Sequence, residues 1–160
     1  MKQIRKYEAA LIQMDTQNDK GENLKKARRF IEEAAAHGAK LICFPEVMNL
    51  IGKNTGEGGG REEVPGYTSE ILCEEAKKHG VYIHAGSITE QVPGQKRSRN
   101  LSFLINPEGE IIAGYRKLHM FDITLSDGTA FRESDRVQGG EEIVTVETEL
   151  GVFGMSVCYD

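Results

Sequence analysis

Long hydrophobic runs are missing from this chain of 160 residues. A membrane-spanning helix needs about eighteen consecutive apolar residues, and no stretch of the sequence approaches that length. The basic residues at positions 1–6 are not followed by the hydrophobic core of a signal sequence. We therefore expect no membrane partner and a cytoplasmic location.

Cysteine is scarce, and the histidines are scattered. The three cysteines are an odd number without a Cys-x-x-Cys pair, which fits a reducing compartment better than a disulfide framework. Cys43 lies in an apolar stretch and Cys73 in a helical pattern, so both are expected to be buried, inert thiols. The four histidines lack the spacing of metal ligands. We expect no metal and no cofactor.

Positive charge is also in short supply. The chain has 20 Lys and Arg against 25 Asp and Glu, whereas binding to a phosphate backbone needs clustered cations. Residues 96–99 form one short basic stretch, which we interpret as the solvated end of a hairpin. The glycines at 56–60 lack the following Lys-Ser/Thr of a phosphate-binding loop, so we expect a simple connection there. No nucleic-acid partner is expected.

The rest of the composition is typical of a globular domain, with 39% apolar and 28% charged residues. Residues 8–14 and 40–44 are predicted strands on either side of a helix over 22–37, whose apolar residues recur on one face. This strand-helix-strand unit favours a layered α/β fold.

A second helix is predicted over residues 68–79. We expect Thr68 or Ser69 to cap its start and Gly80 to end it. Residues 81–88 follow as a strand. The order of elements continues the α/β pattern.

Two hairpins are predicted in the second half of the chain. Residues 100–105 and 110–115 flank a turn with Pro and Gly at suitable positions. Residues 142–147 and 152–157 form the second pair. Because there is no internal repeat and no linker-like break, we expect one domain over residues 1–160.

Three short segments each follow an apolar run and carry one reactive group: Phe44-Pro45-Glu46, Tyr115-Arg116-Lys117-Leu118-His119 and Gly154-Met155-Ser156-Val157-Cys158-Tyr159-Asp160. Strands deliver side chains at such positions to a shared edge of a sheet, where loops open a crevice. Cysteine attack on an amide carbon needs a thiolate or a thiol with a base beside it. Cys158 is the candidate nucleophile, and Glu46 is the candidate base that returns the proton to the departing ammonia. Lys117 and the backbone N–H of Tyr159 suit the stabilisation of an oxyanion.

This Glu-Lys-Cys trio, with these neighbours and in this order, resembles the nitrilase superfamily of carbon-nitrogen hydrolases. The resemblance implies an α-β-β-α sandwich, a thioester intermediate and catalytic roles for Glu46, Lys117 and Cys158. It also implies that Glu133, in Phe131-Arg132-Glu133-Ser134, orients the lysine and the substrate. Members of the family continue well beyond the nucleophile, so we expect residues 1–160 to be the N-terminal portion of a C-terminally incomplete domain.

Within the superfamily, residues 117–122 and 131–134 are most similar to Nit-type amidases, which act on ω-amides of dicarboxylates. N-carbamoyl amino-acid hydrolases and true nitrilases share the trio and remain alternatives. His119 is a candidate for the lining of the pocket, and Arg132 or Arg136 for binding a substrate carboxylate, although either arginine could equally be a surface cation. The expected partners are a small-molecule amide and, in the complete protein, further copies of the chain in a homodimer or larger homo-oligomer.

Two other classes of function remain open. A catalytically silent chain could serve as an oligomerisation or binding module, and Cys158 alone could serve as a redox-sensing thiol. Chain ends fray unless they are tied down, so we expect the turn around Cys158 to be poorly held and the 160-residue chain alone to be inactive and prone to association.

Overall fold

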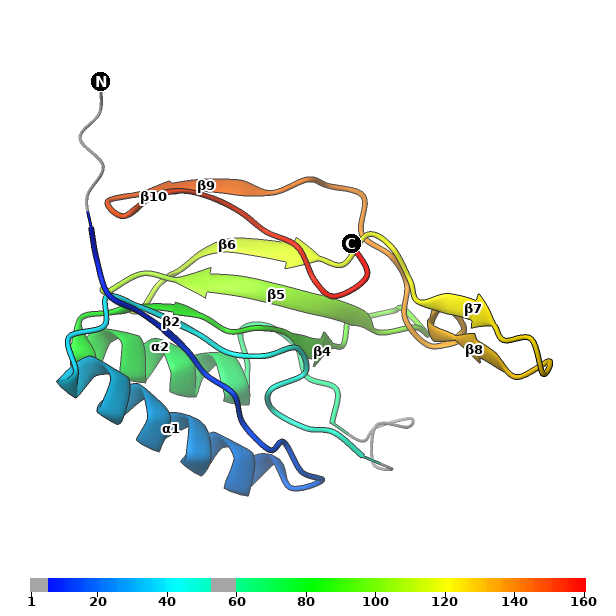
Figure 1. Cartoon of the computed structure of the whole chain (residues 1–160), viewed down its shortest axis with the longest axis horizontal. Helices are drawn as coiled ribbons and strands as arrows, with labels where there is room; N and C mark the ends of the chain where they lie inside the picture. Colours follow the sequence, from blue (N-terminus) through cyan, green and yellow to red (C-terminus); the bar gives the residue numbers. More distant parts are fainter. Residues whose placement is uncertain (1–5, 53–59) are drawn as a thin grey trace.

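The computed structural model describes residues 6–52 and 60–160. Six strands form one mixed sheet, α1 and α2 cover one of its faces, and the β9–β10 hairpin lies over the other (Figure 1). The elements are β1 (Ala9–Leu11), α1 (Lys20–Ala36), β2 (Leu41–Cys43), α2 (Tyr67–His79), β3 (Tyr82–His84), β4 (Ile88–Glu90), β5 (Arg99–Ile105), β6 (Ile111–Arg116), β7 (Asp122–Thr124), β8 (Ala130–Arg132), the 3₁₀ turn η2 (Glu133–Asp135), β9 (Thr145–Thr148) and β10 (Gly151–Gly154). Residues 56–59 of the expected connection lie outside the described residues.

The predicted strand-helix-strand unit is confirmed. β1, β2 and β3 pair in parallel, with α1 as the first crossover. The Asp19 side chain caps α1 by accepting a hydrogen bond from the N–H of Glu22 at 3.0 Å. The face that carries Leu24, Ala27 and Ile31 is buried against the sheet, and each large apolar side chain removed from water contributes about 1.5–3 kcal/mol. The sheet and its helix layer therefore follow from the hydrophobic pattern.

The start of α2 differs from the prediction. The helix is capped by Gly66, and the hydroxyl of Ser69 accepts a hydrogen bond from the Gly66 N–H at 2.8 Å. The N–H of Thr68 donates to the Glu62 carboxylate at 2.8 Å, so a half-buried anion satisfies the helix N-terminus instead of the expected Ser or Thr cap. Gly80 ends the helix in the left-handed conformation, as predicted.

The strand expected over residues 81–88 is wrong as a single element, because the chain leaves the strand conformation at Gly86 and forms β3 and β4 separately. Gly86 has φ +64°, and a Cβ at this position would lie 1.9 Å from the carbonyl oxygen of Pro45. Only glycine allows both this backbone conformation and this close approach. This close approach of Gly86 to the Pro45 carbonyl fixes the segment that leads into Glu46.

Gly86→Ala is expected to lower the free energy of unfolding by about 3 kcal/mol, since left-handed strain adds to a backbone clash. Gly80→Ala is a matched control: its φ is also +64°, but nothing lies within 4 Å of the added Cβ. Strain alone predicts a loss of about 1 kcal/mol for this control. Urea denaturation of both variants checks the difference, and equal losses would contradict a rigid contact at Pro45.

Both predicted hairpins are present. β5 and β6 pair antiparallel through the expected turn, whereas β9 and β10 are shorter than expected. The second hairpin packs Val146 and Phe153 against a buried cluster on the sheet face opposite the helices. Next to it, Tyr115 is buried with Met155 and Val157. The layers are therefore helices, sheet and hairpin, which agrees with part of the expected sandwich.

Residues 96–99 are not simply a solvated hairpin end. Ser98 is buried, and its backbone pairs with Arg136 and Gln138. The Arg99 guanidinium donates to the carbonyl oxygens of Gln138 and Gly139. These contacts fasten the segment after η2 to the start of β5. In the part of the chain that the structure describes, no helix is both long and apolar enough to cross a membrane.

Candidate active site

The Lys117 side chain lies at the centre of the candidate site. It follows β6 directly and is only 2% exposed. Its ammonium Nζ is 2.8 Å from Glu133 Oε2 and 3.7 Å from Glu46 Oε1. Burial lowers the pKa of Lys117, but the hydrogen bond and charge of Glu133, together with Glu46 and Cys158, outweigh it and hold the pKa above its usual value. The site therefore contains a fixed cation between two carboxylates.

Glu46 follows β2 after Phe44 and Pro45. Its Oε1 accepts a hydrogen bond from Asn100 Nδ2 at 2.7 Å. The next residue, Val47, has φ +52°, which is rare for a β-branched residue. The hydroxyl of Ser87 holds this conformation by accepting the N–H of Val47 at 3.0 Å. The backbone on both sides of Glu46 is thus restrained by the β3–β4 connection.

Glu133 begins η2, immediately after the β7–β8 hairpin. Its Oε2 accepts the N–H of Phe121 at 2.7 Å in addition to the Lys117 ammonium. The hydroxyl of Ser134 donates to Asp122, which closes the base of the same hairpin. The hairpin thereby brings Glu133 back to Lys117, which lies 16 positions before it in sequence.

Cys158 lies on the turn after β10, with φ +52°. Partial desolvation raises the pKa of its thiol, the charge of Glu46 and a hydrogen bond with it raise the pKa further, and Lys117 opposes these effects. The net shift is upward, so the protonated thiol is favoured at neutral pH and attack requires a base. Desolvation also raises the pKa of Cys43 and of Cys73.

Asp160 ties this turn to the loop after β6, which Figure 1 shows beside the chain's C-terminal end. Its Oδ2 accepts from the Tyr115 hydroxyl at 2.6 Å and from the N–H of Val157 at 2.9 Å, and its Oδ1 accepts the N–H of His119 at 2.9 Å. These hydrogen bonds outweigh desolvation and lower the pKa of Asp160 to about 2. The expectation of a poorly held turn is therefore corrected.

A cavity of about 800 Å³ joins the reactive groups. Glu46, Lys117, Glu133 and Cys158 all line it. The rest of the lining includes apolar side chains, such as Leu50 and Phe131, and three arginines at positions 61, 132 and 136. It also contains Asp135 and the hydroxyl residues Thr89 and Ser98. Arg132 and Arg136, the two candidates for binding a substrate carboxylate, both line this cavity, and their role stays a prediction.

Neither His119 nor Tyr159 is among the residues that line this cavity. The imidazole of His119 is 66% exposed, and its Nδ1 is 3.1 Å from Asp160 Oδ1, so it faces the anchoring carboxylate rather than the cavity. The Tyr159 ring stacks edge-on against Phe121 with the centroids 5.4 Å apart. The oxyanion role of the Tyr159 N–H stays a prediction.

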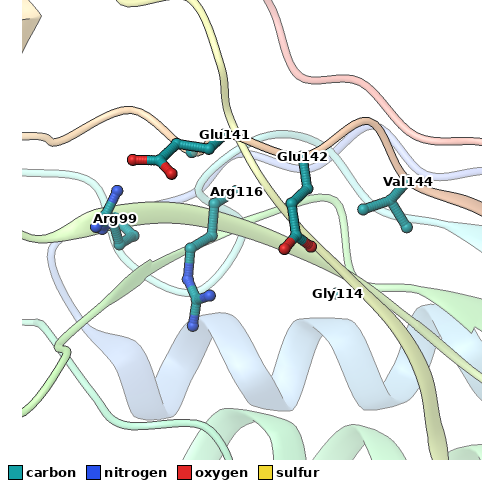
Figure 2. Close-up of a pocket in the computed structure, with 7 residues that line it drawn as sticks. Arg99, Gly114, Arg116, Glu141, Glu142 and Val144 are labelled. Carbon is teal, nitrogen blue, oxygen red and sulfur yellow. The ribbon is translucent and has the colours of Figure 1, made fainter.

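A second cavity, of about 220 Å³, lies over β5 and β6 next to Lys117, and Figure 2 shows its charged lining. Arg116 forms a bidentate ion pair with Glu90 at 2.6 and 2.7 Å. The N–H of Gly140 donates to the carbonyl oxygen of Lys117 at 2.8 Å, and a Cβ on Gly140 would lie 2.3 Å from the Arg116 carbonyl oxygen. The hydrogen bond from Gly140 supports the backbone of Lys117 beside this cavity, and Figure 2 shows the carboxylates of Glu141 and Glu142 in its lining.

Two residues of the site were missed by sequence reasoning, namely Asn100 and Asp160. A polar side chain at the start of the strand predicted over residues 100–105 was the available signal for Asn100. No local signal indicates the partners of Asp160. Within residues 6–52 and 60–160, no group of three or more His, Cys, Asp or Glu side chains is placed to hold a metal ion, and the expectation of a cofactor-free reaction stays a prediction.

The fold and these motifs point to the family of carbon-nitrogen hydrolases. A model of the carbon-nitrogen hydrolase family matches residues 8–160, and the chain belongs to this family. Among its relatives, "Hydrolase C26A3.11" of Schizosaccharomyces pombe is 36% identical over 168 aligned residues, which cover 99% of this chain and 49% of that protein. "Omega-amidase NIT2" of Homo sapiens is 34% identical over 154 residues, covering 96% and 55%.

A solved structure agrees with this assignment. Saccharomyces cerevisiae Nit3, described as a member of branch 10 of the nitrilase superfamily, is 29% identical with a TM-score of 0.79. The match covers 94% of this chain and 55% of Nit3. The resemblance to the nitrilase superfamily is therefore confirmed, and this chain spans about half the length of the curated relatives it matches.

Proposed function

We propose that this chain carries the catalytic residues of a thiol-dependent amidase that converts a small ω-amide to a carboxylate and ammonia. The observation that supports the proposal most strongly is the Lys117 ammonium, buried between Glu46 and Glu133 in the cavity that Cys158 also lines. A buried cation is costly unless it is paired, and a cavity beside it provides a place for charge that develops on a substrate.

The proposed reaction begins with transfer of the Cys158 proton to Glu46 as sulfur attacks the amide carbon. The carbonyl electron pair moves to oxygen, where Lys117 and the N–H of Tyr159 stabilise the oxyanion. Collapse of this intermediate breaks the carbon–nitrogen bond, and Glu46 returns its proton to the departing ammonia. Glu46 then deprotonates a water molecule that attacks the thioester, which releases the carboxylate and restores the thiol.

Glu133 is a positioning residue in this scheme. Its carboxylate contacts the Lys117 ammonium and the N–H of Phe121, but not the thiol through any hydrogen bond of the described residues. It keeps the lysine charged and directs it toward the cavity.

The ω-amide assignment draws on similarity to the human protein named omega-amidase and on the arginines of the cavity. Arg132 and Arg136 line the same cavity as the reactive groups. A guanidinium binds a carboxylate through two parallel hydrogen bonds, which suits the free acid of a dicarboxylic monoamide. In the complete protein, we propose assembly as a homodimer or larger homo-oligomer.

Ammonia release from a panel of substrates tests the function. The panel contains the monoamide of a short dicarboxylic acid, its methyl ester, an N-carbamoyl amino acid and an aliphatic nitrile, and the protein is expressed from its own gene. We expect the free-acid monoamide to be the best substrate, with kcat/KM at least about tenfold above that of the ester. Preference for the carbamoyl compound or the nitrile would favour those branches of the superfamily instead.

Failure of every substrate would favour the silent binding module. Peroxide inactivation that a thiol reverses, without hydrolysis of any amide, would favour the redox sensor. Both outcomes would contradict the amidase proposal.

A further inference from the structure

Asn100 connects two of the three reactive segments. It lies on β5 opposite Thr89 of β4, and it is buried. Its side-chain Nδ2 donates to Glu46 Oε1 at 2.7 Å, while its main-chain carbonyl accepts the N–H of Lys117 at 2.9 Å. A single residue therefore holds the carboxylate of one segment and the backbone of the other.

The chemistry of the amide fixes its direction. An Asn side chain has a donor end and an acceptor end, and a carboxylate accepts hydrogen bonds only, so the donor must face Glu46. The acceptor Oδ1 is then left buried without a hydrogen-bond partner among the described residues. Rotation that would exchange the two ends would place Oδ1 against the carboxylate, which is repulsive. The orientation of Asn100 thus depends on Glu46, and that of Glu46 on Asn100.

The contacts of Glu46 with Asn100 and Lys117 both fall on one of its two oxygens. Asn100 Nδ2 lies 2.7 Å and Lys117 Nζ 3.7 Å from Oε1. The second oxygen, Oε2, is the one we assign to proton exchange with the thiol. We propose that Asn100 is a positioning residue that holds the Glu46 carboxylate in the direction required for proton transfer with Cys158. The inference rests on the proposed function and adds to it a residue outside the Glu-Lys-Cys trio and Glu133.

The chain offers a matched control at Asn49. This residue is also buried, its Nδ2 donates to Glu62 Oε1 at 2.7 Å, and its Oδ1 is likewise buried without a hydrogen-bond partner. Its carboxylate partner serves the N-terminus of α2 rather than the reactive groups. Asn49→Leu therefore removes a similar hydrogen bond to a carboxylate, together with one to the Thr68 hydroxyl at 3.2 Å, without touching the base.

The experiment compares Asn100→Leu with Asn49→Leu in two assays. In steady-state hydrolysis of the best amide, Asn100→Leu is expected to lower kcat about 10- to 100-fold with KM changed less than about twofold, because a misdirected base affects the chemical step rather than substrate binding. Asn49→Leu is expected to keep kcat within about twofold of the wild-type value. It should lower the melting temperature about as much as Asn100→Leu does. An unchanged kcat in Asn100→Leu, or an equal loss in both variants, would overturn the proposal.

The second assay does not require turnover. The rate of Cys158 alkylation by iodoacetamide, followed by peptide mass spectrometry, reports how closely the Glu46 charge is held to the thiol. Asn100→Leu should increase this rate toward that of Glu46→Gln, and Asn49→Leu should leave it unchanged. If no amide is hydrolysed but this difference appears, the proposed function fails and the positioning role of Asn100 stands. If amides are hydrolysed but neither kcat nor alkylation responds, only the inference fails.

Asn100→Asp covers the case in which the leucine variant does not fold. It keeps the side-chain volume and replaces the donor by a second carboxylate next to Glu46. Repulsion between the two groups should then lower kcat at least as much as the leucine substitution. Wild-type kcat in a folded Asn100→Asp protein would overturn the proposal.

Discussion

Cys158→Ala is expected to lose amide turnover by at least about 10⁴-fold, because alanine offers no nucleophile to form the thioester. The fold should be retained. Cys158 is exposed, and the carboxylate of Asp160, not the thiol, makes the hydrogen bonds that hold its turn. Ammonia release and circular dichroism on the same preparation check both halves of this expectation.

Labelling identifies the nucleophile independently of the substitution. Cys43 and Cys73 are less exposed than Cys158 and do not line the cavity of the reactive groups. Brief treatment with iodoacetamide should therefore modify Cys158 first, and a slow amide should leave an acyl adduct on the same peptide. Dominant modification of Cys73, or turnover that persists in Cys158→Ala, would require another nucleophile.

Glu46→Gln and Lys117→Ala are both expected to lower the rate of amide hydrolysis. Their expected effects on the rate of Cys158 alkylation are opposite in direction. Both should lower kcat by about 10²- to 10⁴-fold, because one removes the acid-base group and the other the cation beside the oxyanion. Glu46 raises the pKa of the Cys158 thiol, whereas Lys117 lowers it. Loss of Glu46 should therefore increase the thiolate fraction at neutral pH, and loss of Lys117 should decrease it.

The expected alkylation rate at neutral pH is about threefold higher in Glu46→Gln and about threefold lower in Lys117→Ala, since a more basic thiolate compensates in part by its greater nucleophilicity. The protein is alkylated at pH values from about 6 to 10, which span the usual pKa range of a thiol, and modification of Cys158 is read from its peptide by mass spectrometry. The pH dependence of the rate gives the direction of each pKa change. Lys117→Ala should also be less stable, because it leaves the Glu133 carboxylate without its cation. Near-normal hydrolysis in either folded variant would return that residue to the role of a structural charge.

The regular elements on the helix side of the sheet could be predicted from local patterns. Apolar residues at helical spacing indicated α1, and Pro and Gly indicated the β5–β6 turn. The failures have a common cause. Gly86 divides a predicted strand because the Pro45 carbonyl approaches it from the segment that follows β2, and Glu62 replaces the expected cap of α2 from outside the helix. In both cases a residue distant in sequence decides the local conformation, and no periodicity records such a contact.

The sequence by itself determined which chemical groups the site contains. Glu46, Lys117 and Cys158 could be selected because each stands in its own recognisable local context, and the family assignment follows from those contexts. Local patterns carry this information because the neighbours along the chain set the ends of the strands.

Only the tertiary structure decided how those groups face one another. The Asn100 amide reaches Glu46 across 54 positions of sequence, and the Tyr115 hydroxyl reaches Asp160 across 45. Strand pairing and burial fix these distances. A hydrogen bond is sensitive to changes of a few tenths of an ångström in the donor–acceptor distance, and composition and spacing along the sequence do not encode such changes. The identity of the reactive groups is thus a local property of the chain, whereas the direction of the base and the anchoring of the nucleophile are properties of the packed sheet.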